Sequence, residues 1–119
     1  MAKTGVTGLK RVINAAGYSW LGFKAAYKHE AAFRQELILV LILTPIAIIY
    51  GESFADKTVL IASLVFILLV EILNSAIEAI VDRIGDEVHL LSGRAKDMGS
   101  AAVFLAMVIT CLIWASILI

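Results

Sequence analysis

The chain has 119 residues, of which 61% are hydrophobic and 17% are charged. Soluble domains have about half apolar and about a quarter charged residues, so this composition excludes an ordinary water-soluble domain. Ten basic and ten acidic residues cancel, which leaves no cationic excess for binding nucleic acid and no acidic tail. The single cysteine, Cys111, cannot form an internal disulfide, and its apolar surroundings predict a buried thiol.

The N-terminal segment predicts an amphipathic helix over about residues 6–29. Apolar side chains recur at helical spacing on one face from Leu9 to Tyr27, whereas Lys10 and Asn14 lie off that face. Trp20 and Tyr27 suit the headgroup layer of a membrane, so we expect this helix to lie in the interface. No continuous apolar core follows the first basic residues, and we therefore expect no cleavable signal peptide.

Three uncharged runs follow, at residues 37–50, 58–70 and 98–119. A helix needs about 20 residues to cross the hydrocarbon core. The last run is long enough, the first must extend upstream, and the second must continue through Glu71 and Glu78. Pro45 is expected to kink the first helix. The sequence thus predicts transmembrane helices at about 31–50, 58–82 and 98–119.

The positions of lysine and arginine predict the topology. Six basic residues precede the first span and three lie between the second and third, whereas only Lys57 lies in the turn at 51–57. By the positive-inside rule, the N-terminus and the loop at 82–97 are cytoplasmic, and the C-terminus is outside.

A polar stripe runs along the second predicted span. Five of its residues fall within an arc of about 100° on the helix: Glu71, Asn74, Ser75, Glu78 and Asp82. Carboxylates within a bilayer are costly and usually mark a functional site, although a purely structural line of polar contacts between helices is the alternative. Three spans cannot easily surround this stripe, so neighbouring copies are expected to shield it, with the small residues Ala102 and Ala106 allowing close approach.

Charged residues near the cytoplasmic boundary suggest a cation and phosphate site. Glu30 lies at about the same membrane depth as Glu78, and two carboxylates suit Mg²⁺. Lys96 offers positive charge for a phosphate, while Asp97 is expected to cap the third span and His89 to lie in a solvated loop. There is no P-loop or GxGxxG turn, so spacing alone reveals no nucleotide site.

Four segments carry a resemblance to a known family: EILNSAIEAIVDRIG at 71–85, SGRAKDMGSAA at 92–102, AAGYSW at 15–20 and EAAFRQE at 30–36. Together they resemble the prokaryotic diacylglycerol kinase family over nearly the whole chain. The resemblance implies a homotrimeric all-α protein of the bacterial inner membrane, with a surface helix and three transmembrane helices. It implies an enzyme that uses MgATP to phosphorylate diacylglycerol to phosphatidic acid.

The resemblance also implies a role for individual residues. Glu71 would be the catalytic proton acceptor, and Glu30 and Glu78 would be metal ligands. The implied nucleotide contacts are Arg11, Tyr18, Glu30, Glu78, Glu87, His89, Lys96 and Asp97. The implied contacts to the lipid substrate are Arg11, Ala15, Tyr18, Ser19, Trp20, Arg34, Glu71, Asn74, Ser100 and Trp114.

Membrane depth agrees with this division of roles. Seven residues separate Glu71 from Glu78, about 10 Å along a helix, so Glu71 lies deeper, towards a lipid hydroxyl, and Glu78 lies nearer aqueous ATP. The sequence alone leaves two alternatives open: a polyprenol (undecaprenol) kinase, and a small proton or cation carrier. The acidic and basic residues Glu30, Lys96 and Asp97 at the cytoplasmic edge favour a kinase over a carrier.

Overall fold

The computed structural model describes residues 7–85 and 89–119. Its four helices are α1 Gly8–His29, α2 Ala31–Tyr50, α3 Phe54–Ile84 and α4 Leu90–Leu118. The described residues contain no strand. Because α2, α3 and α4 are each long and apolar enough to cross a membrane, the predicted architecture of one N-terminal helix plus three transmembrane helices is confirmed.

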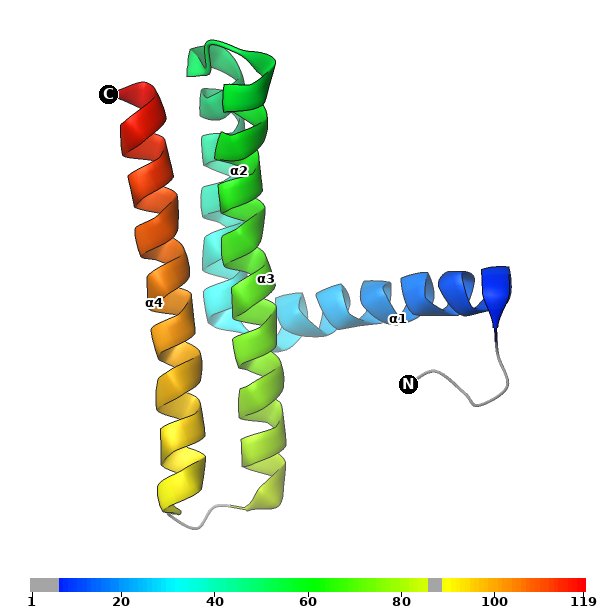
Figure 1. Ribbon diagram of the computed structural model, residues 1–119. Helices are drawn as coiled ribbons and strands as arrows, with labels where there is room; N and C mark the ends of the chain where they lie inside the picture. The colour runs from blue at the N-terminus through cyan, green and yellow to red at the C-terminus, as the bar shows by residue number, and fades with distance from the viewer. Residues whose placement is uncertain (1–6, 86–88) are drawn as a thin grey trace.

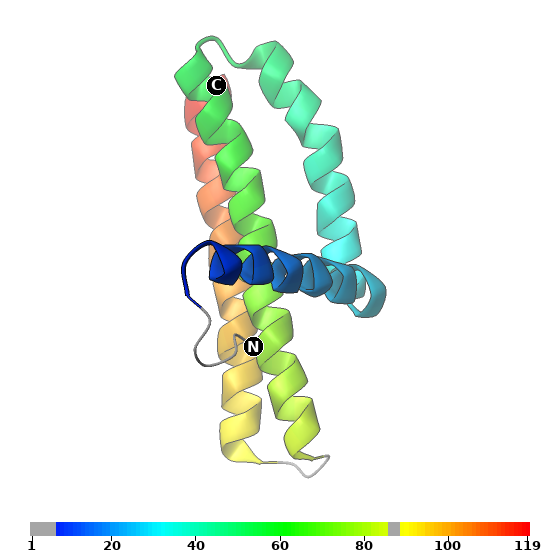
Figure 2. The same ribbon diagram turned by 90° about the vertical axis from the view of Figure 1, so that its right-hand side faces the viewer.

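The first helix lies crosswise to the other three (Figure 1). α3 and α4 run side by side along their length, and α2 packs on α3. In both views the ends of α3 and α4 that meet the loop at 85–89 continue past the level of α1 (Figure 2). An amphipathic helix that lies in the membrane interface should cross the spanning helices in this way.

A single extended residue, Glu30, forms the bend between α1 and α2. Its backbone N–H donates to the carbonyl of Ala26 at 3.0 Å. Arg34, in the first turns of α2, donates from Nη1 to the carbonyls of Tyr27 at 2.7 Å and Lys28 at 3.2 Å. The last carbonyls of a helix have no partner within it and favour a nearby cation. Arg34 therefore caps α1 and fixes the direction in which it leaves the bundle.

One face of α3 forms the packed interior of the chain. Its buried residues recur at intervals of three or four: Leu60, Ser63, Leu64, Ile67 and Glu71. The faces packed against it are equally regular, with Phe33, Glu36, Val40 and Ala47 on α2 and Gly99, Ala106 and Thr110 on α4. This packed stripe is apolar over most of its length and turns polar at Glu71, so the sequence period that builds the core also buries a carboxyl group.

Hydrogen bonds join α3 and α4 in the half remote from the 85–89 loop. Thr110 Oγ1 donates to the carbonyl of Ser63 at 3.1 Å, and Trp114 Nε1 donates to Ser63 Oγ at 3.0 Å. Because Ser63 is buried, these bonds are shielded from water. Interhelical hydrogen bonds of this kind stabilise membrane helix pairs by about 0.6–2 kcal/mol each.

Close backbone approach joins the same two helices nearer the loop. Gly99 on α4 is buried against Asn74 of α3, and a Cβ atom at Gly99 would overlap with Asn74 Oδ1. A larger residue there would have to displace the Asn74 side chain, so space and not backbone conformation favours glycine, since residue 99 has ordinary helical backbone.

The loop between α3 and α4 is shorter than predicted. α4 begins at Leu90, not near residue 98. The prediction that Asp97 caps this helix is wrong, because Asp97 lies inside α4 and His89 is the cap, with Nδ1 accepting from the Leu91 N–H at 3.1 Å. α3 ends at Gly85, whose φ of 149° favours glycine.

Two further local predictions can be compared with the structure. α2 continues as one helix through Pro45, and the kink expected at this residue stays a prediction. The prediction that Cys111 is buried is wrong for the single chain, because Cys111 is exposed.

Replacing Gly99 by alanine should lower the free energy of unfolding by about 1–3 kcal/mol, because either the helices separate or Asn74 is displaced. Gly93→Ala is the matched control on the same helix, since nothing lies within 4 Å of its added Cβ. Alanine should stabilise the helix there by up to about 1 kcal/mol. Reversible unfolding in mixed micelles measures both variants. Equal stability of the two would contradict the close packing at Gly99.

Candidate functional site

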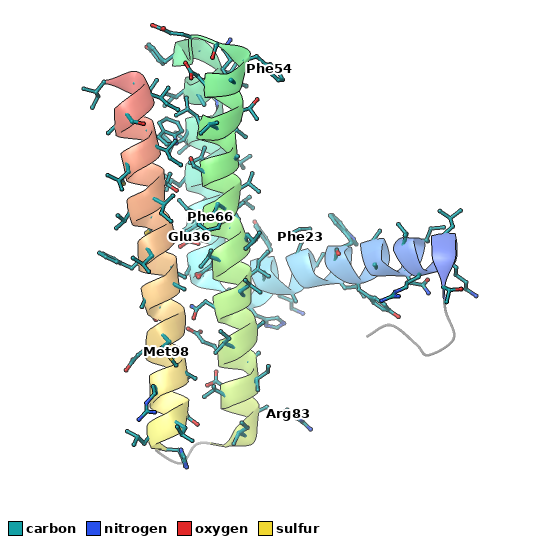
Figure 3. The ribbon with its side chains drawn as sticks, viewed as in Figure 1. Phe23, Glu36, Phe54, Phe66, Arg83 and Met98 are labelled. Carbon is teal, nitrogen blue, oxygen red and sulfur yellow. The ribbon has the colours of Figure 1, made fainter. Side chains whose placement is uncertain are left out.

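Two carboxyl groups lie in the packed interior between α2 and α3. Glu71 is 4% exposed and Glu36 is 8% exposed, and their carboxyl groups are close enough to interact electrostatically. Figure 3 shows Glu36 within the bundle, well away from Arg83 at the loop end of α3. Each residue occupies a core position of its own helix, which explains its burial.

Exposure increases along the polar stripe from Glu71 towards the loop. Asn74 and Glu78 are half-buried, and Asp82 is exposed. Asn74 Nδ2 donates to Glu78 Oε1 at 3.2 Å, which links adjacent turns of the stripe. One helix face therefore leads from a buried carboxyl group to a water-accessible one, as a reaction between a lipid and a soluble substrate would require.

Glu71 is close enough to two other carboxyl groups to interact with them electrostatically. Glu71 interacts electrostatically with Glu78 on its own helix and with Glu30 at the α1–α2 bend. Clustered like charges repel unless a proton or a cation neutralises them. In residues 7–85 and 89–119, no group of three His, Cys, Asp or Glu side chains is arranged to hold a metal by itself. Mg²⁺ bound with substrate phosphates usually needs only one or two carboxylates, and Glu30 with Glu78 fits that requirement.

A lysine brings positive charge to the same end of the stripe. Lys96 Nζ on α4 lies 2.8 Å from Asp82 Oδ1 on α3, and Lys96 also interacts electrostatically with Glu78. The Lys96 and Asp82 side chains are 45% and 65% exposed, so the pair adds little to stability. Lys96 can therefore leave Asp82 at small cost, and it is close enough to Glu78 to interact with it electrostatically.

The predicted site residues on α1 lie apart from these carboxyl groups within one chain. The first half of α1 extends away from the bundle (Figure 1). Arg11 is exposed and lies 19 residues before Glu30, about 28 Å along the helix. Ser19 Oγ donates to the carbonyl of Ala15 at 2.9 Å. Tyr18 and Trp20 are likewise exposed.

The remaining predicted residues occupy several places. Ser100 and Asp97 are exposed on α4 near Lys96, and His89 begins that helix. Trp114 lies 14 residues beyond Ser100, about 21 Å along α4, where it contacts Ser63. Arg34 binds the end of α1. Glu87 lies outside the described residues.

Two apolar grooves lie beside α1, one formed mainly with α2 and the other with α3, and Phe23 borders both. The first, about 630 Å³, is bordered by Trp20, Tyr27, Phe33 and Leu68 among others. The second, about 690 Å³, extends from Ser19 and Gly22 to Ile72 and Leu73 on α3. Ile72 directly follows Glu71 in the chain. The predicted lipid contacts Ser19 and Trp20 thus border apolar space, whereas Glu71 borders neither groove.

Sequence reasoning missed Glu36 as a buried residue. Its position near the expected membrane boundary indicated a side chain reaching towards water. A signal was present, because Phe33, Glu36 and Val40 have the spacing of one helix face. Asp82 was recognised on the stripe, but its pairing with Lys96 depends on how α4 packs.

Comparisons with known proteins agree with the sequence motifs. The sequence profile of the prokaryotic diacylglycerol kinase family matches residues 17–118. A diacylglycerol kinase of Escherichia coli strain K12 is 54% identical over 112 residues, which cover 94% of this chain and 92% of the relative. A diacylglycerol kinase of Pseudomonas aeruginosa is 51% identical over 115 residues, 97% and 94% of the two chains. One from Haemophilus influenzae is 48% identical over 112 residues, 94% and 95% of the two chains.

The family match extends from within α1 through α4 and includes the carboxylate stripe, the α1–α2 bend and the start of α4. The chain belongs to the prokaryotic diacylglycerol kinase family.

Proposed function

We propose that this chain is an ATP-dependent kinase that phosphorylates diacylglycerol to phosphatidic acid. The observation that carries this proposal is the polar stripe of α3, which has a buried carboxyl group at Glu71 and half-buried Glu78 beside Lys96 at its accessible end. The choice of diacylglycerol as the phosphate acceptor is supported by the relatives, which are named diacylglycerol kinase. The apolar grooves beside α1 support a lipid acceptor.

The reaction takes place at the cytoplasmic face of the bacterial inner membrane. The excess of lysine and arginine before α2 and between α3 and α4 favours a cytoplasmic N-terminus and an external C-terminus. The extension of α3 and α4 beyond the level of α1 supports this orientation, because it brings the loop end of the stripe to the aqueous side of an interfacial helix (Figure 1). ATP is available on that side.

Glu71 acts as the general base. Its carboxylate accepts the proton of the lipid hydroxyl as the hydroxyl oxygen forms a bond to the γ-phosphorus of ATP. The bond between that phosphorus and the β,γ-bridging oxygen breaks, ADP leaves with the electron pair, and Glu71 later returns the proton to water. Burial of Glu71 keeps water away from the reacting phosphoryl group.

The chain's charged side chains orient the nucleotide. Glu30 and Glu78 would hold Mg²⁺. When bound, this cation would neutralise negative charge on the nucleotide phosphates. Lys96 leaves Asp82 and contacts a phosphate. Asn74 keeps Glu78 oriented through its hydrogen bond of 3.2 Å.

The active assembly is a homotrimer in which α1 of one copy completes the site of another. Arg11 and Tyr18 lie on the part of α1 that extends away from the bundle, whereas the carboxyl groups with which they are expected to act lie within it (Figure 1). The proximity of Lys96 and Glu78 within one chain supports a site whose α3 and α4 residues come from the same copy. Cyclic symmetry repeats any such contact and yields up to three equivalent sites.

A polyprenol is the second candidate acceptor, because both grooves beside Phe23 are lined mainly by apolar side chains that suit either lipid. Transfer of labelled phosphate from ATP to diacylglycerol and to undecaprenol, measured in parallel with the purified protein, tests the proposal. Preferred labelling of diacylglycerol is expected. Labelling of undecaprenol alone would replace the substrate, and cation flux without phosphate transfer would replace the function by a carrier.

Glu78→Gln should abolish turnover at limiting Mg²⁺ while leaving the fold intact, because an amide keeps the shape but loses the charge that holds the metal. Glu52→Gln is the control, since Glu52 is exposed in the turn between α2 and α3. Initial rates over a Mg²⁺ titration measure the effect. Near-normal phosphorylation by Glu78→Gln at limiting Mg²⁺ would refute its role as a ligand.

Glu71→Gln should lower kcat by about 10²–10⁴-fold with little change in MgATP affinity, because a base acts on the acceptor hydroxyl in the transition state. Nucleotide binding measured by calorimetry, together with kcat, separates the two effects. If affinity falls in step with the rate, Glu71 belongs to the metal site instead.

A further inference from the structure

The mechanism above uses Glu71 but leaves its buried neighbour Glu36 without a role. Both residues lie on the packed stripes of their helices, and both are more than nine-tenths buried. Their carboxyl groups interact electrostatically across the α2–α3 interface. A carboxyl group inside a spanning segment is costly, and the packing position of Glu36 would accept an apolar side chain. Packing alone therefore does not explain a carboxyl group at this position beside the proposed base.

One oxygen of each carboxyl group lacks a partner. Among the residues that the structure describes, no hydrogen-bond donor reaches Glu36 Oε2 or Glu71 Oε2, although both atoms are buried. The charged groups that face Glu71 from the rest of α3 and from the α1–α2 bend are Glu78 and Glu30, and both are acidic. On α4, Lys96 is directed to Asp82 and Glu78. A proton shared by Glu36 and Glu71 removes the repulsion and supplies the missing donor.

The neighbours of the two groups decide which one carries the proton. The amide of Asn74 lies at the carboxyl group of Glu71, and polar contact favours the ionised form there. Glu36 is packed between Phe33 and Val40 on its own helix, and the hydrogen bonds of residues 7–85 and 89–119 include none from its side chain. The proton therefore resides on Glu36, which leaves Glu71 as the carboxylate.

We propose that Glu36 is a positioning residue, whose protonated carboxyl group donates a hydrogen bond to the carboxylate of Glu71 and holds that base in its reactive orientation. This inference rests on the proposed role of Glu71. The proton of Glu36 stays in place during transfer, and the proton of the lipid hydroxyl goes to the second oxygen of Glu71.

Two substitutions of Glu36 separate a hydrogen-bond donor from a packing role. Glu36→Leu removes the donor and should lower kcat by about ten- to a hundredfold, with the KM values for lipid and MgATP unchanged. Glu36→Gln keeps an N–H donor and should retain kcat within about threefold. Glu52→Gln makes the same chemical change at an exposed site and should match the unaltered protein.

Infrared difference spectroscopy locates the proton independently of the rate. At neutral pH the carbonyl band of a protonated carboxyl group should be present in the unaltered protein and in Glu52→Gln, and absent from Glu36→Gln. Three results would overturn the inference: a band that persists in Glu36→Gln, no band in the unaltered protein, or equal loss of kcat in the Gln and Leu variants. A rise in lipid KM at constant kcat would overturn it too, because Glu36 would then bind substrate directly.

The same experiments distinguish this inference from the proposed function. Glu36→Leu at full rate together with an inactive Glu71→Gln refutes positioning by Glu36 and leaves the base in place. Glu71→Gln at full rate refutes the base itself, and the positioning role with it.

Discussion

The cost of placing carboxyl groups in a membrane-spanning helix governs the rest of this structure. Glu71 lies on a helix that is otherwise apolar enough to cross a bilayer, and an ionised side chain there must be covered by protein. α3 achieves this for Glu71 by placing it on the stripe that packs against α2 and α4. Burial of the side chains decreases along the stripe: Glu71 is buried, Glu78 is half-buried and Asp82 is exposed. The stripe therefore leads from the interior of the membrane-spanning bundle towards the aqueous side.

The arrangement of α1 follows from the same constraint. Arg34 holds the end of α1 through its last carbonyls, so the helix leaves the bundle crosswise instead of covering α3. Its exposed apolar face suits the membrane interface, and the grooves beside Phe23 lie where it passes α3. The half of α1 that contains Arg11 extends away from its own bundle (Figure 1). The polar end of α3 is thus only partly enclosed by one chain, and we infer that another copy completes it.

The sequence predicts the architecture well because membrane-spanning segments have a strong composition signal. It predicts the polar stripe because helical period alone aligns Glu71, Asn74 and Glu78. It does not predict the burial of Glu36, the pairing of Lys96 with Asp82, or the close contact of Gly99 with Asn74, because each depends on the rotation of one helix against another. The start of α4 was misplaced because Arg94, Lys96 and Asp97 indicated a loop, whereas α3 and α4 continue as helices beyond the apolar region.

Subunit mixing tests the central claim, a site built from α3 of one copy and α1 of another, most directly. Inactive Glu71→Gln and Arg11→Gln chains, unfolded together and reassembled, should form sites that combine an intact α3 with an intact α1. Activity should return in this mixture and in neither parent, whereas a mixture of Glu71→Gln with Glu78→Gln, both altered on α3, should stay inactive. Mixed oligomers shown by crosslinking to contain Glu71→Gln and Arg11→Gln chains, yet inactive, would contradict the account, as would full activity of the Arg11→Gln parent.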